Sequence, residues 1–194
     1  NLELFKMKPI ILITGKNADL IKRLVSILLN NNEISYLGYL EDFEIKRFQE
    51  FITSSPFSLL IINNTVDIPV DKDYCVGDKE KLKKTIEILN ILPSTFYLVL
   101  NYDDKSVRKI RSFTTLKTIT FGFSKESDVF VSDYKLNGGA NFKVNYEGKV
   151  VPFWLENINS KQQIYGVLAA ISVCLLFGKN LVEISQIMRN YTIL

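Results

Sequence analysis

The sequence predicts an α/β fold in which a mainly parallel sheet is flanked by helices and carries an antiparallel extension. Continuous apolar runs at 9–14, 57–63 and 96–101 are typical of strands that are covered on both faces. Amphipathic segments alternate with these runs, which implies right-handed crossovers between parallel strands. After Phe121-Gly122 the apolar residues alternate with polar ones, which indicates an antiparallel meander.

The first half of the chain alternates strands with helices, and each element has a recognisable stop. Thr14-Gly15 ends the first apolar run, Asn30-Asn31-Asn32 ends the helix after it, and Pro56 and Asn63-Asn64 bound the strand FSLLIIN. The expected strands are 9–14, 34–40, 57–63 and 96–101, and the expected helices are 19–30, 42–52 and 78–92.

The second half begins with the meander, which we place at 127–155. Its strands are joined at Asn137-Gly138-Gly139 and at Glu147-Gly148, both of which are typical of tight turns. Two helices follow, at 160–177 and 181–190, separated by Gly178. No internal repeat or linker interrupts this order, so residues 1–194 are expected to form a single domain.

Composition excludes several classes of function. The chain has no histidine, which rules out His-based triads, His metal sites and a His general base. The 24 basic and 21 acidic residues are spread along the chain, so no nucleic-acid partner is expected. The apolar stretch 164–178 is too short for a membrane span, and residues 1–8 lack the core of a signal peptide. We therefore expect a cytoplasmic protein, with Cys174 buried in an apolar helix.

The stretch ITGKNADLIKRL, residues 12–23, has the strand–turn–helix context of a P-loop-like phosphate-binding loop. However, Asp19 and Leu20 stand where such a loop needs a lysine and a hydroxyl. Thr14-Gly15 is therefore either a strand-ending turn or a weak anion-binding remnant, and Lys16 is the one cation that could still reach a phosphate.

Three further stretches carry a likeness to a known family. They are TIEILNILPSTFYLVLNYDD (85–104), TFGF (120–123) followed by DVFVSDY and ANFKV, and IYGVLAAISVCLLFG (164–178). In order and spacing they resemble the central ATP-binding domain of the Mur ligases, the enzymes that build the peptidoglycan stem peptide. The likeness covers nearly the whole chain. It is closest to the branch that adds the terminal D-alanyl-D-alanine dipeptide.

The catalytic positions of that family are changed in this sequence. In the loop, Ala18 replaces a glycine, Asp19 replaces the phosphate-neutralising lysine, and Leu20 replaces the hydroxyl residue that holds magnesium. In YLGYLEDFEIKRF (36–48), the metal-binding glutamate falls on Tyr36.

Three further family features are changed or missing as well. The carbamylated lysine falls on Thr85, and the His-Asn-x-x-Asn run falls on Gln162, Gln163 and Gly166. The histidine expected just beyond the strand end IINN (61–64) has no counterpart.

The resemblance implies a pseudoenzyme: a Mur-ligase-like domain with a degenerate P-loop, without the family's substrate and C-terminal domains. The cofactor-binding positions that survive as a remnant are Thr14, Gly15, Lys16, Asn17 and Asn101, and no catalytic residue or metal ligand is predicted. ATP and magnesium are implied by the family alone. We expect a scaffold that binds a protein partner, for example in cell-wall synthesis. The alternative is a working ATP-dependent Mur-type ligase or a fragment of one.

Several residues allow two interpretations. Asn101, Asp103 and Asp104 form either a nucleotide-site motif or an Asx turn that closes a strand. Tyr36 and Tyr39 either belong to a recognition surface at the mouth of the loop or fill volume left by a short connection. For two further sets of residues we favour a structural role. Asp78 and Glu80 are expected to be charges at a helix N-terminus and not metal ligands. The aromatic residues are expected to be core or cross-strand partners and not base-stacking groups: Phe142, Tyr146, Phe153 and Trp154.

Overall fold

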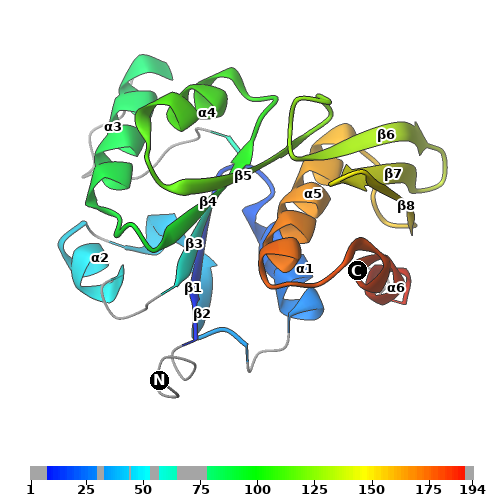
Figure 1. Ribbon diagram of the computed structural model, residues 1–194, viewed down its shortest axis with the longest axis horizontal. Coiled ribbons are helices and arrows are strands. Elements are labelled where there is room, and N and C mark those ends of the chain that lie inside the picture. Colours follow the sequence, from blue (N-terminus) through cyan, green and yellow to red (C-terminus); the bar gives the residue numbers. More distant parts are fainter. Residues whose placement is uncertain (1–7, 30–32, 44, 53–56, 65–77, 191–194) are drawn as a thin grey trace.

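A computed structural model describes the chain except residues 1–7, 30–32, 44, 53–56, 65–77 and 191–194. Its eight strands form one sheet in the order β2-β1-β3-β4-β5-β6-β7-β8 (Figure 1). The strands are β1 Ile10–Thr14, β2 Tyr36–Tyr39, β3 Ser58–Ile62, β4 Phe96–Asn101, β5 Lys117–Gly122, β6 Val129–Leu136, β7 Ala140–Tyr146 and β8 Lys149–Leu155. The helices are α1 Ala18–Leu28, α2 Ile45–Ile52, α3 Asp78–Ile91, α4 Lys105–Ile110, α5 Lys161–Leu176 and α6 Leu181–Arg189, with short 3₁₀ turns η2 Leu40–Asp42 and η3 Arg111–Phe113.

The predicted fold class is confirmed. The apolar runs that end at Thr14, Ile62 and Asn101 are the adjacent parallel strands β1, β3 and β4 of one sheet. Strands β6, β7 and β8 pair antiparallel, as the change of period indicates. The sequence reading missed α4 and β5. Helix α4 is only six residues long, and β5 begins with the exposed Lys117 before its buried half.

Each face of the parallel sheet has its own apolar core. Alternate residues of β1 point to opposite faces, with Ile11 and Ile13 in one cluster and Ile10 and Leu12 in the other. Helices α1 and α5 cover the first face, whereas α2, α3 and α4 cover the second (Figure 1). Burial on both faces is why these strands read as unbroken apolar runs.

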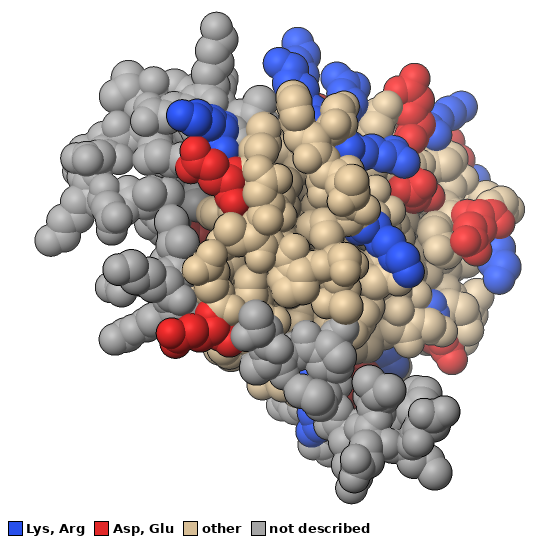
Figure 2. All heavy atoms as spheres, turned by 60° about the vertical axis from the view of Figure 1, so that its left-hand side comes forward, with Lys and Arg blue, Asp and Glu red and all other residues tan. Residues whose placement is uncertain are grey.

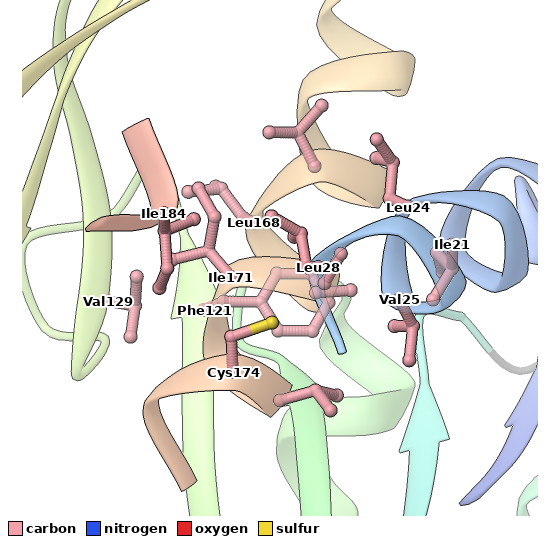
Figure 3. Packing of buried hydrophobic residues seen from close by; sticks show 14 of the residues in the cluster. Ile21, Leu24, Val25, Leu28, Phe121, Val129, Leu168, Ile171, Cys174 and Ile184 are labelled. Carbon is pink, nitrogen blue, oxygen red and sulfur yellow. The ribbon is translucent and has the colours of Figure 1, made fainter. Parts of the chain in front are cut away.

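Helix α5 is the centre of the first core. Residues 164–174 are all buried, and the helix packs against α1, β4 and β5. Figure 3 shows Leu168, Ile171 and Cys174 of α5 beside Phe121 of β5. Burial raises the pKa of the Cys174 thiol to about 12, so this cysteine is a packing residue, as predicted. Cys75 lies outside the described residues.

A short junction joins the parallel and antiparallel parts of the sheet. Strand β6 pairs with β5 only through Phe121–Val129 and Gly122–Phe130, so most of β6 extends beyond the end of β5. The intervening turn is held by Asp128, whose Oδ2 accepts bonds from the backbone N–H of Thr120 at 2.7 Å and from its hydroxyl at 2.6 Å. The meander therefore rises at the carboxyl edge of the parallel sheet.

The aromatic residues of the meander divide between core and surface. Phe142 and Phe153 are buried and stacked, with ring centroids 5.7 Å apart, which confirms them as a cross-strand pair. Tyr146 is half-buried, but Trp154 is 44% exposed on β8. Trp154 lies opposite Asn141 of β7, so it is a cross-strand residue, as predicted, but not a core residue. Among the described residues, no helix has both the length and the apolarity to cross a bilayer.

Candidate functional site

The loop after β1 has the backbone of a tight turn at the carboxyl edge of the sheet. Gly15 has φ 99°, and a Cβ at this position would lie 2.6 Å from Asn64 Oδ1. Asn17 has φ 61° and precedes α1 without a side-chain cap. Both the left-handed conformation and the close approach of Asn64 therefore require a glycine at position 15.

A series of amide side chains ties this loop to the neighbouring strands. Asn63 Nδ2 donates to Lys16 O at 2.7 Å, and Asn101 Nδ2 donates to Asn63 Oδ1 at 3.1 Å. Asn101 Oδ1 accepts from Asp103 N at 3.1 Å, which is the predicted Asx turn. Lys16 N donates to Asn64 Oδ1 at 2.5 Å. The carboxyl ends of β1, β3 and β4 are thus linked by hydrogen bonds.

A pocket of about 170 Å³ opens at the same edge. Of the predicted remnant, Lys16 and Asn101 line it, whereas Thr14 instead donates its hydroxyl to Glu41 and Asn17 Nδ2 donates to Gln162 O at 2.8 Å. Among the described residues, the lining consists of Lys16, Asn63, Asn64, Asn101, Asp103, Asp104, Gln162 and Tyr165. Asn63 and Asn64 could be found from the sequence, since they follow a buried strand, but no sequence signal points to Tyr165.

The two carboxylates of the pocket have structural partners. Asp103 accepts from Phe123 N at 2.6 Å, from Ser124 N at 3.2 Å and from Tyr165 Oη at 2.8 Å. Asp104 is the N-cap of α4 and accepts from two backbone amides at 2.9 Å. Burial and the bond to Asp103 raise the pKa of Tyr165, so its hydroxyl remains a donor. Lys16 is the one cation among the described residues that line the pocket.

Asp19, at the position of the family lysine, is exposed and is not among the residues that line the pocket. Its Oδ1 accepts a hydrogen bond from Tyr39 Oη at 2.5 Å, and Lys22 Nζ lies 4.6 Å from the centroid of the Tyr39 ring. The hydrogen bond to Asp19, helped by partial burial, raises the pKa of Tyr39 to about 12. Tyr39 therefore lies beside the loop, as predicted.

Leu20, at the position of the metal-binding hydroxyl, contacts α5. A Cβ on Gly166 would lie 3.2 Å from Leu20 Cδ2, so the leucine fits because position 166 has no side chain. Gln163, on the same turn of α5, is used at the helix start, where its Oε1 accepts from Asn159 N at 2.8 Å. The first turn of α5 thus packs directly over the loop.

Two further altered positions, Tyr36 and Thr85, are packed within the fold. The Tyr36 ring meets Phe43 and Phe51 edge-on, at centroid distances of 5.6 and 5.0 Å. This favours the volume-filling interpretation for Tyr36. Thr85 is buried in α3, and the side chains of Asp78 and Glu80 lie outside the described residues. Within the described part of the chain, no three His, Cys, Asp or Glu side chains gather as metal ligands would.

The parallel sheet, the glycine turn after β1 and the polar pocket at the carboxyl edge define an α/β domain of the nucleotide-loop type. No family model matches the chain. Its sequence is 27% identical over 143 residues to the UDP-N-acetylmuramate–L-alanine ligase of Alkaliphilus metalliredigens, a match that covers 71% of this chain and 30% of that protein. The enzyme of the same name from Clostridium beijerinckii is 30% identical over 137 residues, which cover 70% of this chain and 29% of the relative.

Solved structures of Mur ligases have the same fold. MurF from Acinetobacter baumannii superimposes with a TM-score of 0.72 at 15% identity, over 95% of this chain and 46% of that one. MurF from Thermotoga maritima, solved in complex with ADP, gives a TM-score of 0.69 at 13% identity over 93% of this chain and 48% of that one. The relatives of this chain are therefore Mur ligases, and its fold is that of their central domain. The chain matches less than a third of the length of these curated relatives.

Proposed function

We propose that this Mur-ligase-like domain does not carry out ATP-dependent ligation and acts instead by binding a protein partner linked to cell-wall synthesis in the cytoplasm. The observation that carries the proposal is the carboxylate of Asp19 at the phosphate-neutralising position, held by Tyr39. The link to the cell wall comes from the relatives, whose name describes the joining of L-alanine to UDP-N-acetylmuramate.

The charge at position 19 opposes a nucleotide. Asp19 is exposed, and a carboxylate about 4 Å from a phosphate repels it by ~1 kcal/mol in water. The attraction of the missing lysine is lost in addition. Lys16 supplies one positive charge to the pocket, but its backbone N–H is already bonded to Asn64 Oδ1 and does not point to a ligand.

The groups that would hold magnesium are also missing or engaged elsewhere. Leu20 offers no oxygen and packs on Gly166, and Tyr36 packs on Phe43 and Phe51. Asp103 accepts three hydrogen bonds from protein donors. The residues around the loop therefore do not fit Mg-ATP, and we derive no catalytic step from them.

A thermal-shift measurement tests the loss of nucleotide binding. A ligand at 100 times its dissociation constant stabilises a protein by about 2.7 kcal/mol, which would raise the Tm of a domain of this size by roughly 5–10 °C. We expect no such shift with millimolar Mg-ATP. A variant carrying Ala18→Gly, Asp19→Lys and Leu20→Thr should gain a shift, but no ligase activity, because Tyr36 and Thr85 still offer no metal ligand.

Activity of the unaltered chain would overturn the proposal. If it formed ADP when given Mg-ATP, UDP-N-acetylmuramate and L-alanine, it would be a working ligase. A Tm shift with Mg-ATP but without ADP formation would leave a nucleotide-binding domain and contradict the proposed loss of the phosphate site.

The partner-binding part has its own test. Tyr39 is half-buried beside the loop, and tyrosines bury large areas at interfaces at low entropic cost. In pull-down experiments from the native host, Tyr39→Ala should lose a partner that the wild type retains. Tyr146→Ala, at a half-buried tyrosine of the meander, is the matched control and should retain it. Equal partner sets for both folded variants would exclude this surface.

A further inference from the structure

All the charged residues of helix α4 and of the η3 turn after it are basic. From residue 105 to residue 113 the chain holds four cationic residues and no acidic one: Lys105, Arg108, Lys109 and Arg111. All four are exposed, and none forms an ion pair with a described carboxylate. We call these four residues the α4 basic surface.

The packing of α4 explains why these charges point to solvent. Val107 and Ile110 are buried in the second core, so the short helix is anchored by one side. Lys105, Arg108 and Lys109 are spaced three and four residues apart, which places them together on the opposite side. Figure 2 shows Lys and Arg side chains, with some Asp and Glu side chains beside them, along the upper rim, the edge of the molecule where α4 lies in Figure 1.

Two acidic groups border this surface without forming an ion pair with its cations. The Asp104 carboxylate caps α4 through Ser106 N and Val107 N. Glu126 accepts from Tyr102 Oη at 2.7 Å, and the Arg108 guanidinium lies 5.2 Å from the centroid of that tyrosine ring. Lys117 is not part of the surface, because its Nζ donates to Tyr97 Oη, whose ring packs on the other core.

An exposed apolar side chain directly follows the charges. Phe113, in η3, is 58% exposed, the most exposed of the large apolar residues that the structure describes. It is two residues from Arg111, at the end of the basic segment. Positive charges around an exposed aromatic ring are the two features that bind a protein reversibly to the surface of an anionic bilayer.

We propose that the α4 basic surface binds peripherally to an anionic phospholipid bilayer, with Phe113 inserted among the headgroups. This goes beyond the proposed partner binding and uses a different part of the molecule. Four basic residues reach the number at which such clusters attach to anionic lipid. Lysines are depleted in protein–protein interfaces, so Lys105 and Lys109 suit a lipid surface better than a protein partner, while arginines serve in both.

Co-sedimentation of the full chain with vesicles tests the proposal. We expect binding to vesicles of 30% phosphatidylglycerol in phosphatidylcholine, little binding to pure phosphatidylcholine, and release by 0.5 M salt. Each basic residue near such a surface contributes about fivefold in partitioning, so Lys105→Gln/Arg108→Gln/Lys109→Gln should weaken binding about 100-fold. Phe113→Ser should weaken it about fivefold at unchanged charge.

The matched control removes three exposed charges elsewhere, in Lys135→Gln/Lys149→Gln/Arg189→Gln. This variant should keep most of the binding, and circular dichroism should show all variants folded. Equal binding to both lipids, absence of binding, or an equal loss in the control triple would overturn the proposal. Tighter binding to polyglutamate or to duplex DNA at the same salt would assign the surface to a protein or a nucleic acid instead.

Discussion

At the scale of single residues, two of the positions that depart from the Mur-ligase pattern have acquired partners inside the fold. The Asp19 carboxylate accepts a hydrogen bond from the Tyr39 hydroxyl, and the Leu20 side chain fills the space beside Gly166. An unfilled gap beside Gly166 would destabilise the fold by about 1 kcal/mol, whereas Asp19 is exposed and is held in place by its bond to Tyr39. The loop is therefore held by contacts of its own.

The Asp19–Tyr39 bond gives the first prediction. Because the folded pKa of Tyr39 is raised from 10.0 to about 12, the bond stabilises the fold fully below pH 10 and is lost as the pH rises through 12. Absorbance titration of phenolate should show that Tyr39→Phe removes an ionisation near pH 12. If the variant instead lacks an ionisation near pH 10, Tyr39 does not hold this bond in solution.

At the scale of elements, the contact between α1 and α5 decides how closely the loop is covered. Gly166 lies inside α5, where alanine is normally favoured over glycine by about 1 kcal/mol. Here the added Cβ would press on Leu20 Cδ2 at 3.2 Å. The steric effect therefore opposes the intrinsic helix preference.

A double-mutant cycle separates the two effects. We expect Gly166→Ala to be neutral or destabilising in the wild type, but to stabilise the Leu20→Ala background by about 0.5–1 kcal/mol. Urea unfolding of the four proteins measures both differences. Equal effects of Gly166→Ala in both backgrounds would show that the two side chains do not press on each other.

Some elements could be predicted from the sequence and others could not. Strands β1, β3 and β4 were predictable because burial on both faces leaves an unbroken apolar run. Helix α4 was missed, although Asp104 is an N-cap residue, because six residues give too little periodicity. The amide series Asn63–Asn101 depends on the register of β3 with β4, which aligns Ile62 with Leu100. Strand register is a tertiary property, so the pocket could only be partly predicted.

At the scale of the whole molecule, one apolar cluster joins the parallel and antiparallel parts. The first core contains Ile11 of β1 as well as Phe142 and Leu155 of the meander, so the meander is not an independent unit. The eight strands should therefore unfold in one cooperative transition.

Truncating Phe142 tests this cooperativity. Phe142→Ala should destabilise the entire domain by about 3–5 kcal/mol, because it removes a stacked and fully buried ring. Trp154, the single tryptophan, reports on β8 by fluorescence, whereas circular dichroism reports on all helices. Both signals should change at the same urea concentration. A fluorescence transition at a lower urea concentration than the circular dichroism transition would mean that the meander unfolds alone.

The packing of α5 against α1, which are far apart in the sequence, also has a consequence for biosynthesis. Helix α1 is made before α5, and this partner on the same face of the sheet is complete only at Leu176. At roughly 5–20 residues per second, a ribosome needs on the order of ten seconds to pass from one to the other. Throughout that interval the apolar face of β1, β3 and β4 has no helix α5 to cover it. Nascent chains paused before residue 161 should therefore be the ones that molecular chaperones hold.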